Sequence, residues 1–367
     1  MRRWCVAWLA AACVALLAAC SGSQSGAKVV NVYNWSDYID PQVLKDFEKQ
    51  YGIKVNYDVF DKNEVLETRL LTGNTGFDVV VPSAPFLELE IRAGALEKLD
   101  KSLIPNLKYI DPAITASVAQ YDPGNQYAAD YMWISSGLGY NVQALKARMP
   151  DAPLDSWRLL YDPAVVSKFK DCGVTVVDEP TEVVATALLY LGRNPNSESP
   201  ADLAAAMKLL MGIRPYVRYV NSSRYIDDLA NGEICLALGW AGDVMQAEVR
   251  AHQAGRTYTI AYSIPKEGAI ENFDVLAIPL HAPHYRNANL FINYLLDPRV
   301  AARNSNLIMY ANGDIEAARP YLDKSVADDP GIYPPASVMR TFVPERARSM
   351  KFMRLLTRAW TNFKTGS

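Results

Sequence analysis

Two short clusters in this sequence each combine an indole ring with a carboxylate. Trp35-Ser36-Asp37-Tyr38 lies near the start of the chain, and Gly239-Trp240-Ala241-Gly242-Asp243 lies about two hundred residues later. An aromatic face attracts an ammonium group by about 0.5–2 kcal/mol, and a nearby carboxylate neutralises its charge and accepts its N–H protons. The pairing therefore fits the binding of an organic cation. Either cluster alone fits equally a buried aromatic at a strand edge beside a turn aspartate.

The first cluster follows an alternating, β-branched stretch typical of a strand. Asp40-Pro41 then offers an N-cap and a proline at the first helical position. The elements expected here are a strand at 28–35, a helix at 41–51, a strand at 54–60, a helix at 63–71 and a strand at 78–81. Such alternation predicts a mainly parallel sheet, whose carboxyl edge gathers ligands. Trp35, Asp37 and Ser83 are expected at that edge.

The second cluster lies in a region that also alternates strands and helices. Its expected elements are a strand at 173–177, helices from about 180 to 191, at 201–211 and at 224–231, and a strand at 234–238. Trp240, Asp243 and Glu182 then sit at strand ends or helix starts of a different domain, which predicts a cleft between two sheets. We expect a first crossover at 131–137, a return strand at 256–262 and a third pass near 304–312, leading into a helical tail.

The N-terminus has the pattern of an export signal. Met1-Arg2-Arg3 is followed by a short apolar run and then by Cys20 and a Ser/Gly-rich stretch, which favours a cleaved signal over a permanent membrane helix. Leu17-Ala18-Ala19-Cys20 resembles a bacterial lipobox, so we expect residues 1–19 to be a lipoprotein signal peptide and 20–27 a flexible linker lipidated at Cys20. An ordinary secretory signal is the alternative.

The composition bounds the function classes. Removing residues 1–19 leaves 348 residues and takes the formal net charge from −3 to −5. No basic run suggests nucleic acid. A chain of this length with 50% hydrophobic residues favours two globular domains.

Two of the five cysteines remain once the N-terminal ones are set aside. Cys5 and Cys13 lie in the signal and Cys20 is the expected acylation site, which leaves Cys172 and Cys235. In an oxidising compartment this pair favours a disulfide, with two buried thiols as the alternative.

Several longer motifs carry a family resemblance. They are the Trp-Ser-Asp-Tyr cluster, Tyr57-Asp58-Val59-Phe60-Asp61, the run from Gly76 to Ser83, the run from Asn231 to Asp243, and Pro330-Gly331-Ile332-Tyr333-Pro334-Pro335. From about Lys28 to the C-terminus, the chain resembles the periplasmic polyamine-binding proteins of ABC importers, most of all the putrescine-binding type.

That resemblance implies an α/β, two-lobed periplasmic binding protein of type II, the Venus-flytrap form, with a discontinuous first domain. The expected first lobe comprises residues 28–134 and 257–306, and the second comprises 135–256 and 307–367. It also matches Cys172 and Cys235 to the disulfide pair of the family.

The resemblance further implies a ligand site. Trp35, Trp240 and Tyr310 would enclose the methylene chain of a diamine, and Asp37, Asp243 and Asp274 would be its anionic partners. The polar lining would be completed by Ser36, Tyr38, Ser83 and Glu182, with Ser223 as a weaker candidate. One departure is Asn272, which stands where the putrescine receptors carry an aromatic residue. Asn272 could accept a hydrogen bond from an amine or help to admit a longer polyamine.

The expected mechanism follows from the charge of the ligand. Each ammonium of putrescine needs a carboxylate when it is buried, and three aspartates and one glutamate exceed that requirement, which leaves room for water or for another amine. Occupancy would favour a closed form that an ABC permease and its ATPase recognise. We expect a monomer in the periplasm, attached to a membrane only by its lipid, without cofactor, metal or nucleic acid.

Two rival functions remain open at the level of sequence. An exported hydrolase would use two of the carboxylates for catalysis, and a sensor would pass ligand occupancy to a signalling partner. His281 and His284 are interpreted as a surface loop rather than a metal pair, since no further ligand lies at a suitable spacing. Trp133 and Trp157 are expected to be packing residues.

Overall fold

The computed structural model describes residues 28–366 of the chain. The expected signal peptide, the linker up to residue 27 and the acylation site Cys20 lie outside these residues. Within residues 28–366, no helix combines the length and the apolar character that crossing a membrane requires.

The first lobe is built on one half of an 11-stranded sheet with the order β2-β1-β3-β10-β5. β1 pairs in parallel with β2 and β3, whereas β10 is antiparallel to β3 and β5. The strands of this half are β1 (Val29–Trp35), β2 (Lys54–Phe60), β3 (Val79–Val80), β4 (Leu96–Glu97), β10 (Ala269–Pro279), β11 (Phe342–Pro344) and the first part of β5 (Ala128–Asn141).

Helices cover the first half of the sheet. They are α2 (Pro41–Tyr51), α3 (Asn63–Thr72), α4 (Ala84–Arg92), α5 (Pro112–Val118), α13 (Tyr285–Leu295) and α14 (Pro298–Ile308), with short turns of helix at α15 (Ile315–Ala318), α16 (Lys324–Ala327) and α17 (Ala336–Met339) and 3₁₀ turns at Lys101–Leu103, Pro105–Tyr109 and Arg319–Tyr321. α2 begins as the sequence predicts, because the side chain of Asp40 accepts a hydrogen bond from the Gln42 N–H at 2.8 Å. It ends at Gly52, whose φ of 64° suits glycine.

The second lobe continues the sheet as β5-β8-β6-β7, with β9 also paired to β5. Its strands are β6 (Val174–Val176), β7 (Val217–Val220), β8 (Leu236–Trp240) and β9 (Ile260–Ser263). Its helices are α6 (Val142–Arg148), α7 (Arg158–Tyr161), α8 (Pro163–Val166), α9 (Pro180–Tyr190), α10 (Pro200–Ile213), α11 (Arg224–Asn231), α12 (Ala241–Gln253) and α18 (Met350–Thr365), with 3₁₀ turns at Ser167–Phe169 and Arg214–Tyr216.

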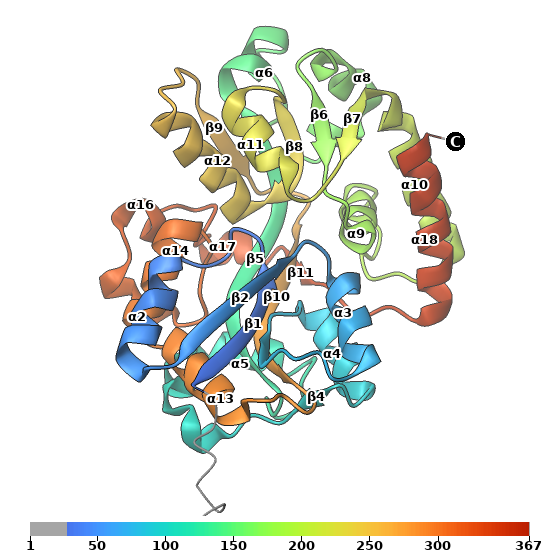
Figure 1. Cartoon of the computed structure of the whole chain (residues 1–367). Helices are drawn as coiled ribbons and strands as arrows, with labels where there is room; N and C mark the ends of the chain where they lie inside the picture. The colour runs from blue at the N-terminus through green and yellow to red at the C-terminus, as the bar shows by residue number, and fades with distance from the viewer. Residues whose placement is uncertain (1–27, 367) are drawn as a thin grey trace, which may run out of the picture.

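The long strand β5 joins the two lobes (Figure 1). Its residues up to Ser135 pair with β10, and its residues from Ser136 pair with β8 and β9. The buried apolar side chains form two separate clusters, one on each side of this change of partner. The chain crosses twice more, between β9 and β10 and between β11 and α18, so that several connections link the lobes.

The packing of two segments differs from the expected lobe boundaries. β9, expected as the return strand of the first lobe, pairs with the second half of β5, and Ile260 belongs to the second core. In the other direction, Tyr310, Val326 and Ile332 pack in the first core, so the final crossing comes after β11 rather than near 304–312. We therefore propose shifting 257–263 to the second lobe and 307–344 to the first.

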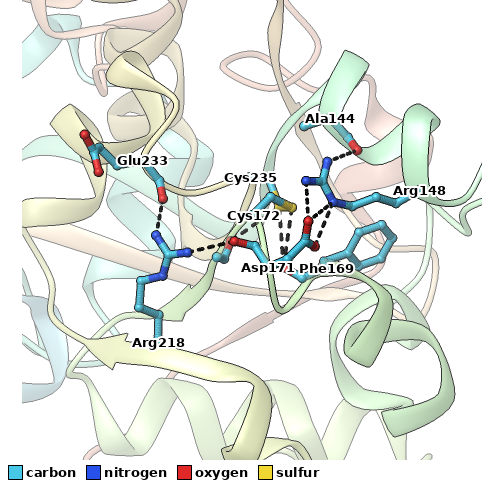
Figure 2. A network of polar contacts seen from close by, with 9 residues as sticks. Ala144, Arg148, Phe169, Asp171, Cys172, Arg218, Glu233 and Cys235 are labelled. Carbon is cyan, nitrogen blue, oxygen red and sulfur yellow. Dashed lines mark hydrogen bonds and ion pairs between the residues drawn. A yellow bond between two sulfur atoms is a disulfide. The ribbon is translucent and has the colours of Figure 1, made fainter.

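The expected disulfide is present between Cys172 and Cys235, which are 63 positions apart. It ties the turn before β6 to the start of β8 in the second lobe (Figure 2). Arg148 lies beside it and donates to Asp171, while Arg218 Nη2 donates to the Asp171 carbonyl at 3.1 Å. The bridge therefore holds strands together in the lobe body, at a distance from the strand ends that carry the expected site.

Candidate functional site

The first lobe presents its expected residues at strand ends. β1 ends at Trp35, and Ser36 and Tyr38 lie in the turn that follows. Ser83 stands at the N-cap of α4, and Asp274 lies in β10, where the two residues form an isolated β-bridge. The bridge explains how a serine and an aspartate far apart in sequence reach the same place.

The second lobe supplies its expected residues from helix starts. Trp240 ends β8 and α12 begins directly after it, so Asp243 lies in the first turn of α12. Glu182 lies in the first turn of α9, and Ser223 is at the N-cap of α11. Acidic side chains at such positions are favoured by the positive end of the helix dipole.

All twelve residues expected to bind ligand line one pocket between the lobes. They are Trp35, Ser36, Asp37, Tyr38, Ser83, Glu182, Ser223, Trp240, Asp243, Asn272, Asp274 and Tyr310. The remaining described lining residues are Phe60, Asp61, Asn63, Phe86, Ile134, Glu179, Thr181, Ser222, Ile226 and Glu345. Seven of the described lining side chains are carboxylates, and none is a lysine or an arginine. The pocket is therefore built for positive charge.

Asp243 and Asp274, called the aspartate pair below, are buried and held by hydroxyl groups. The Tyr310 and Tyr225 hydroxyls donate to Asp243 at 2.6 and 2.8 Å. Ser83 Oγ and the Tyr38 hydroxyl donate to Asp274 at 2.6 and 2.9 Å. Burial raises the pKa of Asp243 to about 6 and that of Asp274 to about 7, while these hydrogen bonds oppose the rise.

The two glycines of Gly239-Trp240-Ala241-Gly242-Asp243 make room for those tyrosines. A Cβ on Gly242 would lie 2.2 Å from the Tyr310 ring, and a Cβ on Gly239 would lie 2.5 Å from the Tyr225 ring. Neither contact is sterically possible. The two glycines therefore allow Tyr225 and Tyr310 to pack closely enough for their hydroxyls to reach Asp243.

Glu179, Glu182 and Glu345, called the glutamate cluster below, are also buried, with exposed fractions of 8%, 5% and 6%. Trp240 Nε1 donates to both oxygens of Glu182, at 3.0 and 2.9 Å. Burial, followed by the charge of Glu345, raises the pKa of Glu182 to about 8. Burial also raises the pKa of Glu345, and it raises that of Glu179 well above its ordinary value. These carboxyls favour a proton or a nearby cation.

Asp37 differs from the other two expected aspartates. Its side chain is 58% exposed and lies 3.4 Å from Arg250 of the second lobe. It occupies a left-handed backbone conformation with a φ of 53°, which aspartate tolerates better than most residues. Asp37 thus stands at the rim of the pocket and contributes to contact between the lobes.

Two further contacts bring the lobes together around the pocket. Lys62, at the start of α3, forms an ion pair with Asp178 of the second lobe. Tyr310 belongs to the first core, yet its hydroxyl donates to Asp243 of α12. In the described conformation both lobes therefore contribute residues to one site.

Comparison with known proteins places this architecture in a family. Residues 42–334 match the family described as bacterial extracellular solute-binding protein. The chain belongs to that family. The putrescine-binding periplasmic protein PotF of Escherichia coli is 50% identical over 341 residues, covering 92% of each chain. The putrescine-binding periplasmic protein SpuD of Pseudomonas aeruginosa is 47% identical over 340 residues, again covering 92% of each chain.

Solved structures agree with the fold of this solute-binding protein. A putative spermidine/putrescine ABC transporter protein from Listeria monocytogenes superposes with a TM-score of 0.82 at 30% identity, covering 93% of this chain and 100% of the other. The expected two-lobed periplasmic binding protein fold and the resemblance noted in the sequence are confirmed. The relatives are named for binding and transport rather than for catalysis.

The aromatic residues of the solute-binding protein line the pocket in different ways. Trp35 packs on Phe60 with ring centroids 4.5 Å apart, and its Nε1 donates to the Val81 carbonyl at 2.9 Å. Tyr310 meets Tyr38 edge to face at 5.0 Å. Each ring is thus fixed by protein contacts, which leaves rigid apolar walls available to a methylene chain.

Asn272 contacts the glutamate cluster. Its Nδ2 donates to Glu345 Oε2 at 3.1 Å, and its Oδ1 accepts from the Phe273 N–H at 2.9 Å. Both ends of the amide are therefore engaged with the protein. The polar residue that stands in place of an expected aromatic lies beside an additional buried acid.

The remaining sequence expectations concern histidine and tryptophan. His284 Nδ1 lies 2.9 Å from Asp78 Oδ2, and no group of metal-ligating side chains occurs within residues 28–366. Trp133 and Trp157 are buried in the two cores, as expected for packing residues.

Sequence reasoning missed three acids of the pocket: Asp61, which directly follows β2, Glu179 and Glu345. Glu345 follows β11, a three-residue strand whose pairing with β10 is distant in sequence and carries no local signal. Glu179 directly precedes α9 and lies three positions before Glu182. Its place at a helix start, next to an expected site residue, was a signal that could have found it.

Proposed function

We propose that this chain is the substrate-binding receptor of an ABC importer that captures putrescine or a related linear polyamine between its lobes. The observation that carries the proposal is the pocket between the lobes with seven carboxylates, no basic side chain among its described lining residues, and aromatic walls. Buried ammonium groups require such partners, and rings suit the methylenes between them. The names of the relatives support the same ligand class.

The proposed roles of the residues follow from their contacts. Asp243 and Asp274 accept N–H hydrogen bonds from one ammonium group while keeping their hydroxyl donors. Glu182 accepts N–H hydrogen bonds from the other ammonium group. Trp35, Trp240 and Tyr310 bury CH₂ groups, each worth about 0.8 kcal/mol. Ser36, Tyr38, Ser83, Ser223 and Asn272 complete the polar lining, and Asp37 closes the rim.

Occupancy would be transmitted through the lobes. Only the closed form brings Asp274 of the first lobe and Asp243 of the second to one ligand, so the ligand stabilises that form by its differential contacts. We propose that a membrane permease with its ATPase recognises the closed shape and receives the polyamine, and that the receptor acts as a monomer without catalysis.

The proposed location is the periplasm, in line with the names of the relatives. The Leu17-Ala18-Ala19-Cys20 sequence supports attachment to a membrane through a lipid on Cys20. Replacement of Cys20 by serine should release the exported protein from the membrane fraction, whereas retention in that fraction would contradict the anchor.

Calorimetric titration of the purified protein with putrescine tests the function. The expected result is saturable binding of one diamine per chain with recovery of unchanged putrescine. Absence of binding to every linear amine would overturn the receptor, and conversion of the amine into a product would favour the hydrolase.

A further inference from the structure

The last helix, α18, carries several basic side chains and no acidic one. Its buried face packs in the second core through Phe352, Leu356, Trp360 and Phe363. Lys351, Arg354 and Arg358, called the basic face below, follow one another at spacings of three and four positions, so they share one side of the helix. All three are exposed. α18 therefore presents a positively charged side to solvent along one flank of the molecule (Figure 1).

The side chains of the basic face have no partner within residues 28–366, because none of them forms an ion pair, a hydrogen bond or a contact with an aromatic ring there. Other arginines of the second lobe are paired, such as Arg148 with Asp171 and Arg224 with Asp228. The whole chain carries a formal net charge of −3. Three uncompensated cations on one helix face are therefore a local exception, which points to a partner outside the chain.

The surroundings of α18 do not neutralise the basic face. The helix packs against α10 and α9. On α10, Asp202 is already in an ion pair, and exposed Lys208 adds a further base. On α9, the one charged side chain is Glu182, which lines the pocket between the lobes. Glu198 lies at the start of α18, where it accepts from the Ser349 N–H and Oγ at 2.7 and 2.6 Å. These acids are thus engaged with groups other than the basic face.

Exposed apolar side chains lie among these charges. Met350 is 66% exposed and Leu355 is 39% exposed. Met350 precedes Arg354 by four positions and Leu355 follows Lys351 by four, so both lie on the same side of the helix as the basic face. A helix face that combines basic and exposed apolar side chains suits an anionic lipid surface, because the headgroups attract the cations while the apolar side chains enter the interface.

The proposed lipid on Cys20 would bring such a surface close to the body of the protein. Eight positions separate Cys20 from Lys28, where the described residues begin. A chain of eight residues spans at most about 28 Å when it is fully extended. The body would therefore stay beside the bilayer, whose anionic headgroups complement the charge of the basic face.

We propose that the basic face of α18, together with Met350 and Leu355, docks on the anionic phospholipid surface of the membrane. This inference goes beyond the proposed function, and the contact itself requires neither the lipid on Cys20 nor a polyamine. It fixes which flank of the second lobe lies on the membrane. It also leaves the pocket between the lobes free, since no residue of α18 is among the described residues that line that pocket.

Flotation with lipid vesicles tests the contact in the absence of the lipid anchor. The protein used is residues 21–367, exported behind a cleavable secretory signal; it lacks Cys20 and contains both cores. It should bind vesicles of equal parts phosphatidylglycerol and phosphatidylcholine about tenfold or more tightly than vesicles of phosphatidylcholine alone. High salt should remove most of this difference, because it screens the exposed charges.

A triple substitution assigns the binding to α18. The variant neutralises the basic face by Lys351→Gln, Arg354→Gln and Arg358→Gln, and it should bind the phosphatidylglycerol vesicles about tenfold or more weakly than the unsubstituted protein. The matched control removes the same charge from exposed lysines of α2 and β2 in the first lobe, by Lys45→Gln, Lys49→Gln and Lys54→Gln. The control should bind these vesicles as the unsubstituted protein does.

Two results would overturn the docking of α18 on lipid. The first is equal binding to both kinds of vesicle, or binding to neither. The second is an equal loss of affinity in the two triple variants, which would show attraction of the total charge rather than contact through α18. The comparison of lipids needs no substitution, so a variant that fails to fold leaves the test intact. The vesicle assay contains no polyamine, so its failure is distinct from a failure of the proposed function.

Discussion

The aspartate pair and the glutamate cluster line one pocket, yet their buried carboxylates differ in how many hydrogen-bond donors the protein supplies. Asp243 and Asp274 are surrounded by tyrosine and serine hydroxyls, which stabilise the charged form. Among the glutamates, Glu182 has an indole N–H, and Glu179 Oε1 has no donor. An acid that is supplied with donors keeps its geometry before ligand arrives, whereas an acid without them depends on protons or on the ligand itself.

This difference suggests distinct roles for the two groups of acids under the proposed function. Under the proposed function the aspartate pair would hold one ammonium, and its hydroxyl donors, which come from both lobes, would make that binding depend on closure. The glutamate cluster adds buried acids whose raised pKa values favour a proton or a nearby cation.

Removal of an acid of the aspartate pair should have the largest effect. Asp243→Ala leaves an ammonium without its buried partner and two tyrosine hydroxyls without their acceptor, which costs about 3 kcal/mol or more, about a hundredfold in affinity for putrescine. Titration calorimetry measures the loss. Asp151→Ala, on the exposed surface, is the control and should bind normally. An unchanged affinity in Asp243→Ala would show that the site lies elsewhere.

The pH dependence of binding should follow the raised pKa values, about 8 for Glu182, 7 for Asp274 and 6 for Asp243. Below these values the empty pocket holds protons, and a cation favours the ionised acids, so binding releases protons and weakens as the pH falls from about 8 to 6. Each released proton gives about a tenfold change per pH unit. Alkylammonium groups stay charged throughout this range.

Titrations at three pH values and in buffers of different ionisation enthalpy count the released protons. The loss should begin near the pKa of Glu182, because that value, about 8, is higher than those of Asp274 and Asp243. An affinity that does not change between pH 8 and 6 would contradict the buried acids as ligand partners.

Loss of the indole N–H at the glutamate cluster should have a moderate effect. Trp240→Phe keeps an aromatic wall but removes both hydrogen bonds to Glu182, so the pKa of Glu182 should rise further and putrescine should bind about three- to tenfold more weakly at pH 7. Trp35→Phe is the matched variant, since its Nε1 bonds the Val81 carbonyl rather than an acid. A larger loss of putrescine affinity in Trp35→Phe than in Trp240→Phe would contradict the proposed role of the Trp240 hydrogen bonds to Glu182.

The ion pair at the rim should matter least. Arg250→Gln removes the 3.4 Å contact with exposed Asp37, and such pairs contribute at most about 1 kcal/mol. Putrescine affinity should fall about twofold, and the difference should shrink at high salt. Arg319→Gln, which breaks an exposed pair with Asp328 within one lobe, is the control. A tenfold loss of affinity in Arg250→Gln, without a loss in Arg319→Gln, would show that the Asp37 contact is a major determinant of binding.

Much of the site could be predicted because its residues follow local patterns. Trp35 and Trp240 end strands whose alternation is visible in the sequence, and Glu182 and Asp243 begin helices. Family motifs then placed Tyr310 and Asp274 with them, and all line the one pocket.

The parts that could not be predicted depend on contacts distant in sequence. β11 pairs with β10 across about seventy positions, and this pairing alone carries Glu345 into the pocket. The proposed shift of β9 to the second lobe rests on its pairing with β5, which an isolated strand pattern does not specify. The proposed shift of the segment around Tyr310 rests on packing against the first core, which depends on three-dimensional shape.

The central claim is that the pocket selects positive charge on a flexible hydrocarbon chain. Calorimetric titration of the wild-type protein with putrescine and with 1,4-butanediol, its uncharged counterpart of equal chain length, tests it most directly. The account predicts saturable binding of one putrescine per chain and no measurable binding of the diol. Equal affinity for the two compounds, or failure to bind putrescine, spermidine or any other linear amine, would contradict it.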